Sequence, residues 1–118
     1  MSILKRDREK DIILGSEVLR AEILRLPDVD KRDKVQELYV TVDEEVTFDA
    51  GVKDRASQIQ VQANIKAMDS FHIASAEKGR ADVFLTTDDR LIKSCKRLRL
   101  DLRVMNPVTY LAEVIEDA

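Results

Sequence analysis

A short apolar run between two helical patterns is the feature that most constrains the fold. Val83-Phe84-Leu85 has the length and composition of a buried strand rather than a helix. Before it, the segment from Asp69 onward repeats apolar residues at helical spacing, and Gly79 is placed to end that helix as a left-handed cap. After it, Thr86-Thr87-Asp88-Asp89 is typical of the start of a new helix. A helix–strand–helix unit of this kind predicts an α/β fold with a parallel sheet.

The rest of the chain alternates strand and helix patterns with short connections. Further strands are expected at 11–15, 39–42 and 102–105. Further helices are expected at 17–26, 28–38 and 89–98. Two more helices are expected, one that begins after the cap Asp43 and one at 108–115 that follows Asn106-Pro107. Residues 2–10 are polar and predict the last turns of a helix. Residues 58–65 fit a strand or a packed connector, and we favour the connector. The order predicts a three-layer α/β fold, a mostly parallel sheet flanked by helices.

Composition limits the class of protein. A chain of 118 residues predicts a single domain spanning 1–118, and 44% hydrophobic with only 4% aromatic residues predicts an aliphatic core. The net charge of −3 argues against a protein held on nucleic acid by bulk charge alone. The lone Cys95 excludes an intrachain disulfide. No apolar run approaches the roughly 18 residues of a membrane span, so no membrane association and a cytoplasmic location are expected.

Three acids lie at, or one turn beyond, expected strand–helix junctions: Glu22, Asp69 and Asp88. Because the carboxyl ends of parallel strands meet at one edge of a sheet, we expect these side chains to gather there. Carboxylates are the hard ligands that Mg²⁺ or Mn²⁺ prefers, and such ions activate water for cutting a phosphodiester.

Each candidate also has a plain structural explanation. Asp69 and Asp88 are in positions where Asp commonly caps a helix. Glu22 falls inside an apolar helical face, which requires a basic partner, a metal or a rotated helix. His72 is expected to be a packed histidine with a hydrogen-bond partner. Ser70 and Thr86 are expected to make local caps, and Cys95 is expected to be an inert core thiol. The basic side chains after Asp88 are expected to form either a phosphate-binding rim or a solvated face: Arg90, Lys93, Lys96, Arg97, Arg99 and Arg103.

Several motifs occur in an order that resembles the PIN domain family. They are Ser16-Glu17-Val18-Leu19-Arg20-Ala21-Glu22-Ile23, Asp69-x-x-His72-x-Ala74-x-Ala76, Thr86-Thr87-Asp88-Asp89-Arg90-Leu91, and Arg103-Val104-Met105-Asn106-Pro107 with Tyr110-Leu111. The resemblance covers residues 11–115.

The resemblance implies a Mg²⁺- or Mn²⁺-dependent nuclease acting on RNA. It also implies the toxin of a toxin–antitoxin pair, hence an antitoxin-like partner, and a homo-oligomer such as a dimer. Carried over by position, Glu22, Asp69 and Asp88 are the catalytic, metal-binding acids, and Asp89 and Thr86 are auxiliary. Arg90, Lys93 and Arg97 are the nucleic-acid rim.

The chain departs from the family pattern at its start. PIN domains begin with a central strand that ends in Asp, and no such strand is expected before Asp11, since Asp7 lies in a charged, helix-like segment. The sequence therefore predicts an N-terminally truncated fold without the first strand and helix. The resulting gap in the sheet would be filled by a partner chain, an exchanged segment or a shifted pairing, with residues 59–65 as one candidate. With three acids instead of four, the ion should bind more weakly.

Two other functions remain open at this point. The first is a non-catalytic interaction or nucleic-acid-binding module with a vestigial metal site. The second is a flavodoxin-like or receiver-type α/β domain that uses acids for Mg²⁺, which would need an acid pair after its first strand, where this chain has Leu14-Gly15-Ser16.

Overall fold

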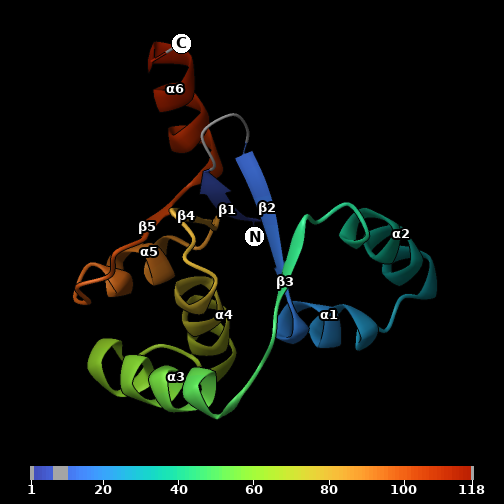
Figure 1. Cartoon of the computed structure of the whole chain (residues 1–118), viewed down its shortest axis with the longest axis horizontal. Helices are drawn as coiled ribbons and strands as arrows, with labels where there is room; N and C mark the ends of the chain where they lie inside the picture. Colours follow the sequence, from blue (N-terminus) through green and yellow to red (C-terminus); the bar gives the residue numbers. More distant parts are fainter. Residues whose placement is uncertain (1, 7–10, 118) are drawn as a thin grey trace.

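The computed structural model describes the backbone of residues 2–6 and 11–117, and side chains for residues 13–113, 115 and 116. The described part forms a mixed α/β fold (Figure 1). Its strands are β1 (Ser2–Arg6), β2 (Asp11–Ser16), β3 (Glu44–Val46), β4 (Val83–Leu85) and β5 (Arg103–Met105). Its helices are α1 (Glu17–Leu24), α2 (Val29–Tyr39), α3 (Ala50–Ala63), α4 (Ala67–Lys78), α5 (Asp89–Cys95) and α6 (Pro107–Asp117).

The strands form one sheet in the order β3-β2-β1-β4-β5. β2 pairs with β3 in parallel, as β4 does with β5, while β1 runs antiparallel to both β2 and β4. The four other strands therefore point the same way, as a mostly parallel sheet requires. Helices lie on both sides of the sheet in Figure 1, and α6 extends away from the end of β5.

The central strand β1 corrects the expectation for the start of the chain. Residues 2–6 are a strand and not the end of a helix, and they fill the middle of the sheet between β2 and β4. The expected gap is thus closed by the chain itself, because β1 pairs with β2 on one side and with β4 on the other. Residues 58–63 belong to α3, so neither a connector nor a gap-filling strand forms there. Residues 7–10, with Asp7, lie outside the described residues.

The junction of β2 and α1 forms as expected. Ser16 ends β2 and caps α1, where its Oγ accepts a hydrogen bond from the Leu19 N–H at 3.0 Å. Val18 and Ile23 are the buried residues of α1, which ends two residues earlier than predicted. This junction fixes the direction in which α1 leaves the sheet.

The segment between α1 and α3 differs from expectation. Residues 39–42 form the end of α2 and a turn, not a strand, and the strand is Glu44–Val46. Leu38, near the end of α2, is 69% exposed. Asp43 caps no helix, because its carboxylate accepts from the Ile13 N–H at 2.8 Å, and Asp49 caps α3 instead. The β propensity of residues 39–42 therefore did not decide the position of the strand; the pairing of Glu44–Val46 with β2 did.

Helix α4 is the centre of the core. Ile73, Ala74 and Ala76 on α4 are buried with Ile59 of α3 and Phe84 of β4. After α4, Gly79 has φ −74° and is not left-handed, contrary to prediction, whereas Arg80 has φ 56°. Glycine is needed at 79 for space: a Cβ there would lie 2.7 Å from Val46 Cγ2.

The last elements form as the sequence predicts. Asp88 caps α5 with its carboxylate, and the Asn106 Oδ1 accepts from the Val108 N–H at 2.8 Å at the start of α6. None of the helices within the described residues is long and apolar enough to cross a membrane.

Candidate active site

Glu22 of α1 faces His72 of α4, and the two helices lie side by side. The Glu22 Oε2 is 2.6 Å from the His72 Nε2, and the histidine side chain is 2% exposed while that of the glutamate is 43% exposed. An ionised carboxylate needs a donor, so the Nε2–H donates to Glu22. The expectation that His72 is a buried histidine with a partner is confirmed. It also explains how an acid is tolerated inside the apolar face of α1.

Asp69 lies in the first turn of α4, one turn before His72. The N-cap of α4 is Lys66, so the capping explanation for Asp69 is wrong. The pKa of the Asp69 carboxyl is raised above its ordinary value, first by burial and next by the negative charge of Asp88, with a further contribution from Glu22. The charges of Glu22 on α1 and of Asp88 at the start of α5 therefore both act on Asp69 of α4.

Asp88 is held at the start of α5 by several bonds. Its Oδ1 accepts from the Arg90 N–H at 3.0 Å and the Leu91 N–H at 3.2 Å. The buried Thr86 accepts from the Asp88 N–H through its Oγ1 at 3.1 Å. The capping explanation for Asp88 and the local role of Thr86 are both confirmed. Asp89 follows in the first turn and is exposed.

The carboxylate oxygens of these acids are suitable ligands for a hard divalent cation, but the acids are not close enough together in this structure to hold one. Carboxylate oxygens are the ligands that Mg²⁺ and Mn²⁺ take in proteins. Within the described part of the chain, no three His, Cys, Asp or Glu side chains come close enough together to hold one ion. One oxygen of Glu22 is engaged by His72 and one of Asp88 by the N–H of Arg90, which leaves one oxygen of each carboxylate outside these contacts.

Two residues near the acids are structural. The Ser70 hydroxyl donates to the Lys66 carbonyl oxygen at 3.0 Å, back along its own helix. Cys95 is 4% exposed, and burial, followed by the charge of Asp69, raises the pKa of its thiol to about 11. Cys95 is therefore a buried core thiol, as expected, and a raised pKa makes a thiol a poorer nucleophile at neutral pH.

Cations cover the outside of α5 and the turn after it. Arg90, Lys93 and Arg97 are exposed, and none of them makes an ion pair within the part of the chain that the structure describes. Arg103, expected to belong to this group, is bound to Glu113 at 2.8 Å. The unpaired cations begin two residues after Asp88, so they lie next to the candidate acids.

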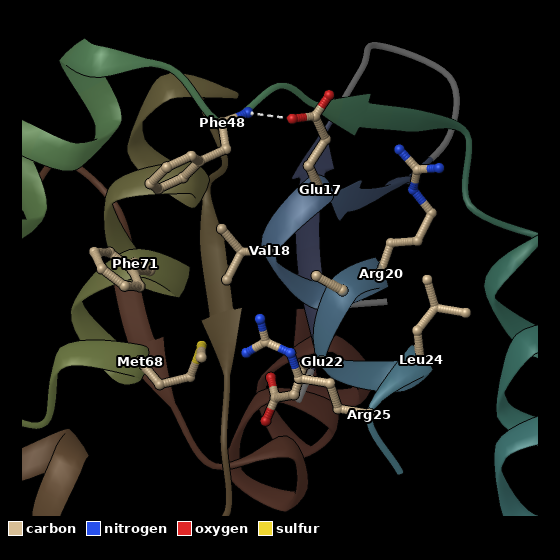
Figure 2. Close-up of a pocket in the computed structure, with 10 residues that line it drawn as sticks. Glu17, Val18, Arg20, Glu22, Leu24, Arg25, Phe48, Met68 and Phe71 are labelled. Atoms are coloured by element: carbon tan, nitrogen blue, oxygen red, sulfur yellow. Dashed lines mark hydrogen bonds between the residues drawn. The ribbon is translucent and has the colours of Figure 1, made fainter.

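A pocket that sequence reasoning missed lies on the other side of Glu22. Figure 2 shows it between α1 and the start of α4, with a volume of about 620 Å³. Its lining is apolar with a charged rim: Glu17, Val18, Arg20, Ala21, Glu22, Leu24, Arg25, Phe48, Met68 and Phe71. The sequence signal was weak, since the two phenylalanines belong to segments far apart in the chain.

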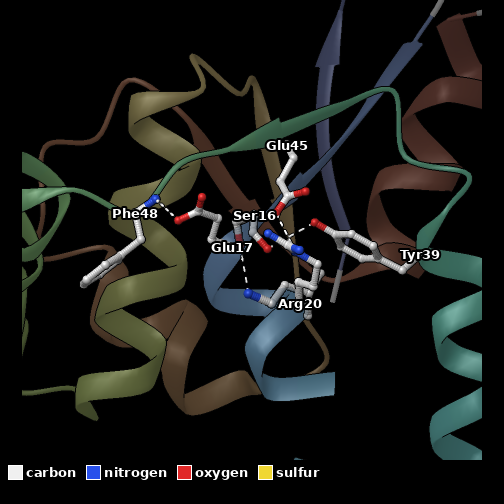
Figure 3. Close-up of polar contacts among 7 residues, drawn as sticks. Ser16, Glu17, Arg20, Tyr39, Glu45 and Phe48 are labelled. Carbon is white, nitrogen blue, oxygen red and sulfur yellow. Dashed lines mark hydrogen bonds and ion pairs between the residues drawn. The ribbon is translucent and has the colours of Figure 1, made fainter. Parts of the chain in front are cut away.

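Polar contacts hold the part of the pocket lining formed by Glu17, Arg20 and Phe48 in place (Figure 3). Glu17 accepts from the Phe48 N–H at 3.0 Å, and the Arg20 Nε lies 2.8 Å from the Glu45 Oε1. The Tyr39 hydroxyl donates to the Ser16 carbonyl oxygen at 3.1 Å, and burial raises the pKa of that hydroxyl. These contacts join α1 to β3 and to the segment after β3, and they join the end of β2 to α2.

The comparison with known families gives one result. The family model described as PIN domain matches residues 2–97, from β1 to just beyond α5, a range that includes all three candidate acids. No curated protein and no solved structure matches the chain. Since the match covers most of the sequence, the chain belongs to the PIN domain family.

Proposed function

We propose that this PIN domain is a divalent-metal-dependent ribonuclease in which Glu22, Asp69 and Asp88 hold Mg²⁺ or Mn²⁺. The observation that supports the proposal is electrostatic: the charges of Asp88 and Glu22, from two other helices, contribute to raising the pKa of Asp69. Membership of a family of nucleases supports the same assignment. Acids that repel one another at neutral pH are stabilised by a cation.

Each residue of the site has a distinct task in this proposal. His72 holds the Glu22 carboxylate in place by the 2.6 Å contact, and the N–H groups of α5 hold that of Asp88. Asp69 contributes negative charge in a half-buried position, and Asp89, the exposed residue after Asp88, is an auxiliary acid. The ion, when bound, supplies activated water and neutralises charge on the phosphodiester.

The cations of α5 and the turn after it support RNA as the substrate. Arg90, Lys93 and Arg97 are exposed and available for phosphate oxygens next to Asp88. Their local positive charge contrasts with the net charge of −3, so binding relies on this face of the molecule.

We extend the proposal to a toxin of a toxin–antitoxin pair that acts as a dimer. Apolar side chains on α6 support a protein contact: Val108 is 75%, Leu111 57% and Ile115 73% exposed, at helical spacing along one face. Sedimentation equilibrium of the wild type and of Leu111→Glu tests the dimer, with a monomeric variant as the expected result. Arrest of bacterial growth on expression, absent with Asp69→Asn, tests the toxin role.

The decisive experiment measures cleavage of a fluorophore–quencher RNA with Mn²⁺. The wild type should cleave, EDTA should abolish cleavage, and Asp69→Asn should lower the rate by roughly 100-fold. The matched control is Asp54→Asn, the same change at an exposed acid on α3, which should retain full activity. Equal cleavage by the wild type and Asp69→Asn would refute the assignment of the site.

A specific observation favours one alternative, a non-catalytic interaction module with a vestigial metal site. The described side chains include no group of three ready to hold an ion. Titration calorimetry with Mg²⁺ and with Mn²⁺ separates the two functions, because a module of this kind gives no heat of binding at millimolar metal.

A further inference from the structure

The pocket beside Glu22 has two aromatic rings in its lining and charged residues at its rim. Phe48 and Phe71 form one wall, with ring centroids 5.5 Å apart and planes at 79°, so the rings make an apolar corner (Figure 2). Val18 of α1 and Met68 of α4 line the same hollow. A volume of about 620 Å³ is within the range of pockets that hold small organic molecules.

The charged residues at the rim are not equivalent. Arg20 is engaged by Glu45, and the Glu17 carboxylate accepts from the Phe48 N–H. Arg25 makes no ion pair among the described residues, and Figure 2 shows its guanidinium reaching back along α1 toward Glu22 and the hollow. An available guanidinium beside an apolar corner is complementary to a ligand that joins a flat ring to an anion.

The position of the pocket relates it to the proposed metal site. Glu22 lines the pocket and contacts His72, and Met68 lines the pocket directly before Asp69. Asp88, whose charge acts on Asp69, is followed in the chain by the exposed cations Arg90 and Lys93. The pocket therefore adjoins two of the candidate acids, Glu22 as a lining residue and Asp69 as the residue after Met68.

We propose that this pocket binds one unpaired base of a single-stranded RNA, stacked in the corner of Phe48 and Phe71, with the adjoining phosphate on Arg25. This inference rests on the proposed function, because it places the base beside the bond to be cut. Bases in a duplex are stacked on each other and are not available to the corner, so the pocket selects unpaired RNA. Every base has a flat face, so the selection depends on strand state more than on sequence.

The test is binding without catalysis. A fluorescein-labelled hexamer of adenosine ribonucleotides is titrated with the full chain in EDTA, and fluorescence anisotropy gives the affinity. Phe48→Leu keeps the apolar volume and removes the flat ring, and it should weaken binding roughly 5- to 150-fold. Arg25→Gln should also weaken binding, whereas Val61→Ala, at a position 83% exposed on α3, should not.

Controls separate this inference from the ribonuclease proposal. Phe71→Leu repeats the ring test from the other wall, and thermal melts verify that each variant is folded. If both ring variants lose binding, the subsite is supported. This holds even if the chain shows no Mn²⁺-dependent cleavage, in which case the subsite is supported and the ribonuclease proposal is not. Three results would each overturn the subsite: no binding by the wild type in EDTA, unchanged affinity in the folded ring variants, or equal affinity for a duplex. The ribonuclease proposal would still be tested independently by the cleavage assay.

Discussion

Glu22 and His72 form a contact that joins two helices through one buried ring. The histidine is 2% exposed, so losing its partner leaves a buried N–H without an acceptor, whereas losing His72 leaves Glu22 able to reach water. We expect His72→Ala to lower the free energy of unfolding by about 2–4 kcal/mol and Glu22→Ala by about 1–2 kcal/mol. Urea unfolding of both single variants and of the double variant should give a coupling energy of roughly 0.5–3 kcal/mol. Additive effects would show that the pair contributes nothing.

Asp69 should show a conflict between stability and function. Its pKa is raised, so the folded state retains a proton that the unfolded state releases once the pH exceeds its ordinary value of 3.8. Stability is therefore lost as the pH rises from that value through the folded pKa. Asp69→Asn removes this loss, and in EDTA at pH 7 its melting temperature should be about 1–4 °C above that of the wild type.

A pH series provides the control for this prediction. The difference between Asp69→Asn and the wild type should vanish well below pH 3.8, where the acid is protonated in both states. Asp54→Asn should not show the effect at any pH. A lower melting temperature for Asp69→Asn at pH 7 would mean that the carboxylate makes a stabilising contact instead.

The candidate acids could be predicted because their positions follow from local patterns. Asp88 comes directly after an apolar strand and before a helix, and Glu22 interrupts an apolar face, which is visible in the sequence. The pairing of Glu22 with His72 was not predictable, since the residues are 50 positions apart and need two packed helices. The pocket was missed for the same reason, because Phe48 and Phe71 meet only in the folded chain.

At the level of elements, the helices with caps were predictable and the pairing of strands was not. Asp28, Asp88 and Asn106 mark helix starts by local chemistry. By contrast, Ser2–Arg6 has only two apolar residues, and its place at the centre of the sheet depends on open edges of β2 and β4 on either side. The strand predicted at 39–42 is wrong for the same reason. Tyr39 is the last residue of α2 and Val40 is its C-cap, although both residues favour strands.

The central position of β1 leads to a prediction at this scale. Leu4 is paired with Ile13 on β2 and with Val83 on β4, so proline at this position removes a backbone donor from the middle of the sheet. Leu4→Pro should lower the free energy of unfolding by about 3 kcal/mol or more, measured by urea denaturation followed by circular dichroism. Leu4→Val keeps the N–H and β propensity and should stay within about 1.5 kcal/mol of the wild type. A fully stable Leu4→Pro would mean that β1 is not a central strand in solution.

For the whole molecule, the distribution of charge matters more than its sum. The net charge is −3, yet Arg90, Lys93 and Arg97 extend unpaired cations over one face beside the candidate acids. If this face carries RNA, binding of a single strand in EDTA should weaken with salt, by a slope of about 0.7 in log affinity against log salt for each phosphate contacted.

Two double variants with the same change in total charge distinguish local from global electrostatics. Lys93→Glu with Arg97→Glu should reduce the salt slope by about 1.4, because two phosphate contacts are lost. Lys34→Glu with Lys53→Glu, at exposed positions on α2 and α3, should leave the slope within about 0.3 of the wild type, since long-range effects of exposed charges are screened at physiological salt. Equal reductions in both variants would show that the RNA senses only the net charge, and the basic face beside Asp88 would then have no role in holding the substrate.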